Sequence, residues 1–403
     1  MKTRAAAPSN ITAEDRQNFS LVLGGPLFQL LCRTRLSDDA LMLVKRRVLV
    51  ISLLAWLPLL VLSALEGNAL GGNLALPFLL DVEAHIRFLV AIPLMIIAEL
   101  LVHRRIRPIV REFRERDLIP PEARDQFDAT IESSLRLRNS VVAELLLIAF
   151  VYGLGVLVVW QQYVSLNAAT WYSTPSSSGS NLSIAGMWYG YVSVPIFQFL
   201  LIRWLFRIFI WARFLWKISR IQLRLSPTHP DRVGGIGFLA DSISAFSVLA
   251  LALSSVLAGQ LANRILYVGA TLPDFVLEIA VVFTFLIFIV LGPLMFFSGQ
   301  LVETQRVGLL EYGRLAERYV REFDNKWLRG GASKEEPFIG SADIQSLADL
   351  SNSFEVVQTM RLVPITTDAI IQLAVAILIP IAPLVLTMMP LEVLAEKLIS
   401  ILF

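Results

Sequence analysis

The sequence predicts an all-α fold: a polytopic transmembrane helix bundle of about seven spans, several kinked by proline, with a small cytoplasmic layer of amphipathic helices. Composition is the first reason. Of 403 residues, 56% are apolar and 17% charged, and the mean hydropathy is +0.65. Soluble domains hold about 45–50% apolar and about 25% charged residues. The other reasons are long apolar stretches and a one-sided distribution of lysine and arginine, both typical of multi-span membrane proteins.

The predicted spans are stretches that reach or approach the ~20 apolar residues needed to cross a bilayer. They are Val48–Leu65, His85–Val102, Val141–Trp160, Ile184–Arg207, Phe238–Ala262, Phe275–Phe297 and Ala369–Met389. Five of them contain proline, which removes a backbone hydrogen bond and kinks a helix. The last span holds Pro380 and Pro383, so a broken or re-entrant helix is the alternative there.

Basic residues orient these spans. The segments 1–47, 103–140, 208–237 and 298–368 carry 30 of the 35 lysines and arginines. The opposite segments carry only Arg264 and Lys397. The positive-inside rule then predicts a multi-pass protein of the cell (inner) membrane, with the N-terminus in the cytoplasm and the C-terminus outside. The uncharged segment 161–183 is expected to be an exposed, flexible outer loop.

The chain therefore divides into alternating membrane and cytoplasmic parts. These are an N-terminal segment (1–47), spans 1–2 (48–102), a helical loop (103–140), spans 3–6 with a Gly-rich inner loop at 225–237 (141–297), amphipathic helices (298–368), and a final span or re-entrant helix with the C-terminus (369–403). Apolar residues at helical spacing predict cytoplasmic helices over Asp125–Arg138, Leu301–Trp327 and Asp343–Arg361, with Ser341 as an N-cap.

Several classes of function are disfavoured. The single cysteine, Cys32, excludes an internal disulfide framework, and His85, His103 and His229 are scattered, so we expect no metal and no cofactor. The net charge of +2 gives no case for nucleic acid. The partners we expect are the lipid bilayer, including its anionic headgroups, and further copies of the chain in a homo-oligomer.

The first candidate site is a set of charges inside predicted spans. Glu99, Glu144, Arg203 and Arg207 fall at the same depth, near the inner end of the membrane, and a lone carboxylate in hydrocarbon costs at least ~2.5 kcal/mol. We therefore predict a buried charge cluster, which acts either as a structural clamp or as an ion or proton relay. At 100° per residue, six cations project within an arc of roughly 140° on the fourth helix. They are Arg203, Arg207, Arg213, Lys217, Arg220 and Arg224. This basic face either binds lipid headgroups or lines an inner vestibule for anions.

The second candidate is the loop before the fifth span, where polar residues and glycines crowd together. Its candidate residues are His229, Asp231, Arg232, Gly234 and Gly235. Glycines before a helix can expose backbone N–H groups to an anion. The alternative is a tight structural turn capped by Asp231.

The third candidate is a polar face of the fifth span, formed by Ser244, Ser247, Ser254 and Ser255. Small residues favour close helix packing, whereas a hydroxyl-lined pore is the alternative.

These features favour an integral membrane channel or transporter for a small ion, with a basic inner vestibule, because polar groups inside spans are costly and usually functional. One alternative is a non-catalytic scaffold that recruits a partner through its cytoplasmic helices. The other is a membrane-embedded enzyme acting on lipid headgroups through His229, Asp231 and Arg232, but no nucleophile motif completes such a site.

Overall fold

The computed structural model describes residues 19–26, 28–29, 43–71, 74–153, 170–176, 179–333, 337 and 341–388. Helix makes up 78% of it and strand 2%, which confirms the all-α class. Five helices are long and apolar enough to cross a membrane, and a bent pair makes a sixth if it counts as one span. The chain therefore has the character of a multi-pass membrane protein, with five or six candidate spans rather than seven among the described residues.

All five candidate spans match predicted spans. The helix α3 agrees closely with the first prediction, and the other four extend beyond the predicted boundaries. The five spans consist of α3 (Val44–Leu65); α4, η2 and α5 (Val82–His85, Ile86–Ala91, Ile92–Glu115); α9, η5 and α10 (Ile184–Trp188, Tyr189–Ser193, Val194–Ile218); η6 and α11 (Gly237–Ala240, Asp241–Val268); and η7, α12, η8, α13 and η9 (Leu272–Phe275, Val276–Leu291, Gly292–Phe297, Ser298–Phe323, Asp324–Leu328). The third predicted span is a shorter apolar helix over its described part, Val141–Gly153, which includes α7 (Val141–Phe150).

Irregular turns accompany three of the prolines in these helices, whereas Pro58 and Pro108 lie inside the α-helices α3 and α5. The π-helical segments η2 and η5 end just before Pro93 and Pro195, and Pro293 lies in the 3-10 segment η8. Proline lacks the N–H that would close the regular ladder, so such turns are expected beside it. In the last apolar stretch, α15 (Thr367–Leu378) and η10 (Ala382–Met388) meet at an angle of 50°.

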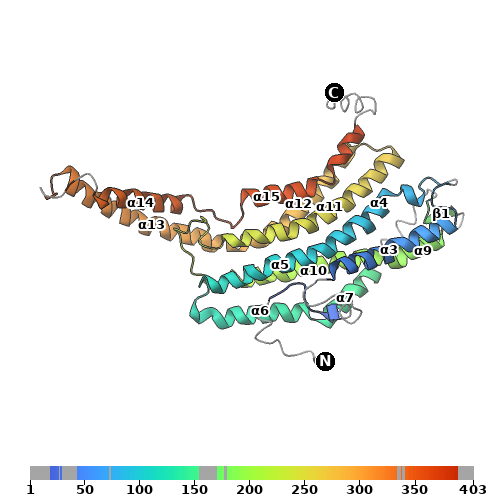
Figure 1. Cartoon of the computed structure of the whole chain (residues 1–403), viewed down its shortest axis with the longest axis horizontal. Helices are drawn as coiled ribbons and strands as arrows, with labels where there is room; N and C mark the ends of the chain where they lie inside the picture. Colours follow the sequence, from blue (N-terminus) through green and yellow to red (C-terminus); the bar gives the residue numbers. More distant parts are fainter. Residues whose placement is uncertain are drawn as a thin grey trace.

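The helices run side by side along the long axis of the molecule (Figure 1). α11 packs against α5 and α15, α3 packs against α5 and α9, and α10 packs against α6 (Arg124–Arg138). Large aromatic side chains fill the spaces between them, and Trp204, Phe88 and Phe113 are almost completely buried. At one end, α13 and α14 (Ala342–Gln358) form a hairpin that extends beyond the other helices (Figure 1).

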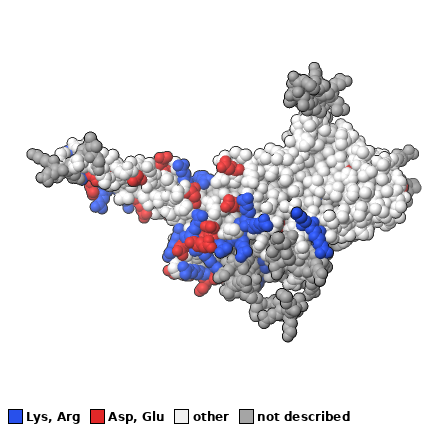
Figure 2. Space-filling view, in the orientation of Figure 1, with Lys and Arg blue, Asp and Glu red and all other residues white. Residues whose placement is uncertain are grey.

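Charge separates along the same axis. Figure 2 shows lysine, arginine, aspartate and glutamate gathered over α6, α13 and α14, which we call the charged end, while the other end is almost free of them on this face. The side chain of Ser341 accepts a hydrogen bond from the N–H of Asp343, which confirms the predicted N-cap of α14. A long apolar body with one charged end is the distribution expected of a helix bundle in a bilayer.

Two sequence expectations are wrong in detail. The helix α10 ends at Ile218, so Arg220 and Arg224 do not share its face with the other cations. Part of the segment expected to be an exposed loop is a hairpin of β1 (Ser173–Ser176) and β2 (Gly179–Leu182), preceded by a fully buried Trp171. The indole of Trp171 packs edge-on against the ring of Phe78 and donates a hydrogen bond to Asp81, so part of this uncharged segment is held against the helices. Residues 154–169 of the third span and this loop lie outside the described residues.

Candidate functional site

Helices α3, α5, α7 and α10 bring five charged side chains together. We call them the Glu99 cluster: Arg47, Glu99, Glu144, Arg203 and Arg207. Glu99 lies at the centre: its carboxylate accepts a hydrogen bond of 2.6 Å from Nη1 of Arg207, forms an ion pair with Arg47, and lies 3.6 Å from Nη1 of Arg203. Arg203 also reaches Glu144, with 3.8 Å between Nη2 and Oε1. The four residues predicted from the sequence therefore lie together, and Arg47 is a fifth member of the cluster that the sequence does not predict.

The cluster is almost inaccessible and carries unequal charge. Its residues are between 2% (Arg47) and 8% (Glu144) exposed. Three arginines face two glutamates, so positive charge is in excess by one. Within the described residues, Nε of Arg47 is buried and has no hydrogen-bond acceptor. Because a buried donor without an acceptor costs about 1–3 kcal/mol, the cluster has an unused capacity to bind an acceptor.

The N-terminal segment closes the cluster on the side of the charged end. Phe19, Leu21 and Val22 are buried, and Phe19 stacks on Phe214 of α10 with ring centroids 5.1 Å apart. Gly25 has a φ of +91°, and a Cβ there would lie 2.9 Å from Oε1 of Glu144. Only glycine combines this backbone conformation with so close an approach. The cavity left on this side is about 10 Å³, at the lower limit of the volume that one water molecule needs.

On its other side the cluster borders a pocket of about 410 Å³ between α3, α5, α7 and α10. Its lining is mostly apolar, but Arg47, Glu99 and Arg203 contribute to it. Ligand pockets are typically about 300–1,000 Å³, with apolar walls and a few polar groups. The Glu99 cluster and this pocket therefore form one amphipathic site.

Three of the remaining cations predicted on the fourth helix make contacts within the protein. Arg213 and Lys217 both donate to the hydroxyl of Ser133 on α6, at 3.0 and 3.3 Å. The guanidinium of Arg220 lies over the ring of Trp216. Of the six cations, only Arg203 lines the pocket described above, while Arg213 and Lys217 connect α10 to α6.

The serines of α11 bond mainly within their own helix. The hydroxyls of Ser244, Ser247 and Ser255 donate to backbone carbonyls three or four residues earlier. The hydroxyl of Ser254 donates to the carbonyl of Ile377 on α15. This contact supports the helix-packing interpretation of the serine face over the pore interpretation.

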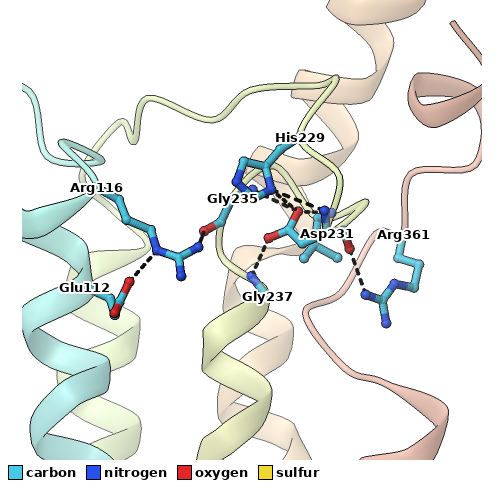
Figure 3. A network of polar contacts seen from close by, with 8 residues as sticks. Glu112, Arg116, His229, Asp231, Gly235, Gly237 and Arg361 are labelled. Atoms are coloured by element: carbon cyan, nitrogen blue, oxygen red, sulfur yellow. Dashed lines mark hydrogen bonds and ion pairs between the residues drawn. The ribbon is translucent and has the colours of Figure 1, made fainter. Parts of the chain in front are cut away.

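The loop before α11 is organised by Asp231 (Figure 3). The carboxylate of Asp231 accepts hydrogen bonds from the backbone N–H groups of Val233, Gly235 and Gly237, at 2.9, 3.1 and 2.8 Å. Nδ1 of His229 lies 2.9 Å from Oδ1 of the same carboxylate. Partial burial raises the pKa of Asp231, but the three N–H donors outweigh it and hold the pKa below its usual value. The N–H groups of Gly235 and Gly237 are thus turned toward the protein's own carboxylate rather than toward an anion.

Neighbouring elements clamp the loop in place. The guanidinium of Arg361 donates to the carbonyl of Asp231 (Figure 3). It also donates to the carbonyl of Ile365, and the backbone N–H of Arg361 donates to the carbonyl of Arg232. Gly234 and Gly235 have φ values of +68° and +97° and lie in the buried turn, while Arg232 is exposed with a φ of +57°. These contacts favour the interpretation of the loop as a structural turn.

A second polar group lies at the opposite end of the same helices, and the sequence does not single it out. We call it the Arg87 cluster: Asp81, Glu83, Arg87, Tyr189, Trp171 and Asn263. Arg87 pairs with Glu83 and donates to the hydroxyl of Tyr189 at 2.6 Å. Asp81 accepts from the N–H of Ala84, the indole of Trp171 and the amide of Asn263. Arg87 lies in η2 and Tyr189 in η5, and π-helical turns of this kind are frequent at functional sites.

Arg47 is the member of the Glu99 cluster that the sequence does not reveal. It belongs to the run Lys45-Arg46-Arg47, which is interpreted as part of the charge bias that orients the spans. The detectable signal is spacing: Arg47, Ile51 and Leu54 fall on one face of α3, and all three line the pocket.

No group of three or more His, Cys, Asp or Glu side chains that would suit a metal ion occurs in the described part of the chain. Comparison of the sequence with protein-family models and with curated proteins, and of the structure with solved structures, finds no match. The geometry of the Glu99 cluster and its pocket therefore carries the functional argument.

Proposed function

We propose that this chain is a membrane transporter for a small anion, which it binds at the Glu99 cluster. The observation that carries this proposal is the burial of three arginines and two glutamates between membrane-type helices beside a pocket. Ionisable side chains inside a bilayer are costly and commonly mark a substrate or ion path. The excess of arginine favours the binding of negative charge, and Arg47 and Arg203 are the arginines that line the pocket.

The proposal includes a placement in the membrane. The charged end lies in the cytoplasm, together with the N-terminus, and the apolar body spans an inner membrane seven times, with the C-terminus outside. The Glu99 cluster then lies near the cytoplasmic interface, where an anion reaches it without crossing the whole bilayer. Anionic lipids surround the basic residues of the charged end, and the chain acts as a homo-oligomer.

Anion flux through purified protein in liposomes tests the proposal. We expect flux above that of empty liposomes for at least one of chloride, nitrate and a short carboxylate, and a fall of about tenfold or more in Arg203→Gln, the effect of losing one interaction with a charged group. The matched control is Arg264→Gln, which breaks an exposed arginine–glutamate pair, Arg264–Glu278. No flux from demonstrably folded protein, or equal flux in both variants, would contradict the proposal.

A scaffold is the second candidate, because the α13–α14 hairpin extends beyond the bundle and exposes apolar side chains. These include Leu309, Leu310 and Leu315 of α13. The double variant Leu310→Glu, Leu315→Glu separates the two functions: it should lose a bound partner if the hairpin recruits one, and leave anion flux unchanged if the Glu99 cluster transports. The enzyme alternative has no observation in its favour, since both oxygens of Asp231 are used by the loop itself.

A further inference from the structure

The pocket beside the Glu99 cluster has its polar groups at one end only. On each of three helices, the charged lining residue is the one nearest the charged end: Arg47 precedes Ile51 and Leu54 on α3, Glu99 follows Ile96 on α5, and Arg203 follows Leu200 on α10. Away from that end the lining is apolar, apart from Tyr152. A ligand that satisfies the whole pocket must therefore carry an anionic head and an apolar body.

The apolar part of the pocket opens sideways. Leu54 of α3, Ile148 of α7 and Tyr152 beyond it are 49%, 42% and 48% exposed, although all three lie in apolar helices. In a bilayer, side chains exposed on such helices face acyl chains rather than water. The pocket is thus accessible from the lipid, and its head end lies at the depth where the headgroups of one leaflet begin.

We propose that this pocket binds a single-chain anionic amphiphile, with its carboxylate or phosphate at Arg47 and Arg203 and its chain between α3, α7 and α10. This inference rests on the proposed function, because it names the class of anion that the transporter takes. The volume of about 410 Å³ lies at the small end of the range for ligand pockets and suits one chain rather than a two-chain phospholipid. The head supplies the acceptor that Nε of Arg47 lacks among the described residues, and it neutralises the excess positive charge.

Binding of radiolabelled dodecanoate and dodecyl phosphate to the full chain in phosphatidylcholine nanodiscs tests the assignment, with empty nanodiscs subtracted. We expect saturable binding of at least one of the two anions. The anion that binds more tightly shows whether the pocket prefers a carboxylate or a phosphate. Dodecanol, which has the chain without the charge, and dodecyltrimethylammonium, which has the opposite charge, should compete at least about tenfold less well.

Two matched pairs of variants locate the site. Leu54→Trp fills the pocket from an exposed position and should weaken binding about tenfold or more, whereas Leu53→Trp, exposed on the same helix but outside the pocket lining, should leave it within about twofold. Arg47→Gln should weaken binding of the anion by a similar factor, whereas Arg46→Gln, its exposed neighbour, should not.

The outcomes separate this inference from the proposed function. Equal binding by Leu54→Trp and Leu53→Trp, or equal competition by dodecanol, would overturn the assignment of the pocket even if small anions are transported. Binding that follows the predicted pattern without any anion flux would keep the pocket assignment and overturn transport. Flux of chloride or nitrate without binding of either amphiphile would support transport and overturn the pocket assignment.

Discussion

The Glu99 cluster and the Arg87 cluster lie on the same two long helices, Val82–Glu115 and Ile184–Ile218, but they carry opposite excess charge. In the Arg87 cluster, Glu83 pairs with Arg87, and the second carboxylate, Asp81, accepts hydrogen bonds from a backbone N–H, an indole and an amide. The chain itself therefore supplies donors for the extra negative charge. In the Glu99 cluster the extra charge is positive, and Nε of Arg47 finds no acceptor among the described residues.

This difference distinguishes a polar cluster that holds structural elements together from one that can bind a ligand. Asp81 joins α4, α11 and the segment before β1, so its hydrogen bonds fix three elements relative to one another. The loop at 229–237 shows the same pattern, because the carboxylate of Asp231 accepts hydrogen bonds from three N–H groups of its own loop. The Glu99 cluster departs from this pattern by combining excess positive charge with an adjacent pocket. A cluster whose excess charge is compensated by the chain's own donors stabilises the fold, whereas excess charge beside a pocket is available to a ligand.

The largest effect on stability is expected for Glu99→Gln. Removing the central carboxylate leaves three buried arginines with one glutamate, and breaking a buried ion pair on one side costs about 3–5 kcal/mol. The comparison is Glu83→Gln, which leaves a single arginine that still donates to Tyr189; we expect it to cost less, about 1–3 kcal/mol. Thermal or denaturant unfolding in micelles, with helix content as the signal, measures both.

The order of these two effects is the informative result. If Glu83→Gln destabilises as much as Glu99→Gln, the charge imbalance of the Glu99 cluster has no special cost, and the distinction between the two clusters fails. Glu99→Gln, Arg207→Gln serves as the control: it restores the excess of one positive charge, so it should recover part of the stability lost in the single variant.

Asp231→Asn is expected to have an intermediate effect. An asparagine retains one oxygen for the N–H groups of Val233 and Gly235, but its amide nitrogen cannot accept from Gly237, so we expect a loss of about 1–3 kcal/mol. Flux and amphiphile binding should remain unchanged, because the loop does not contribute to the pocket lining. Loss of binding without loss of stability would show that the loop is a ligand site after all.

The pH dependence of unfolding tests whether the pKa of Asp231 is lowered in the folded protein. Because the folded pKa of Asp231 lies below its ordinary value of 3.8, its contribution to stability is complete above that pH and is lost as the pH falls through the lower folded value. The difference in stability between wild type and Asp231→Asn should therefore shrink as the pH falls below about 4. A difference that grows as the pH falls below about 4 would contradict the assigned sign.

Much of this architecture follows from the sequence, because apolar length and helical period are local properties. The helices α6 and α14 begin within one residue of their predicted starts, and the meeting of Glu99 with Arg203 and Arg207 follows from equal depth in the membrane. The contribution of Arg47 and the burial of Trp171 depend on how distant segments pack, which no local pattern records. The turn at Ser219 is also missed, because the cations beyond it continue the helical spacing by chance.

The smallest effect is expected for the exposed pair Arg264–Glu278, where Nη1 and Oε1 lie 3.1 Å apart and the side chains are 44% and 47% exposed. A solvated ion pair contributes about 0–1 kcal/mol, because water and salt compete with it. A double-mutant cycle of Arg264→Gln and Glu278→Gln should therefore give a coupling free energy in this range that falls as salt is added. The same arginine–glutamate chemistry would then differ in strength from the Glu99–Arg207 pair through burial alone. A coupling above about 2 kcal/mol that salt does not change would place Arg264 in hydrocarbon rather than water, and would remove it as the control for the transport experiment.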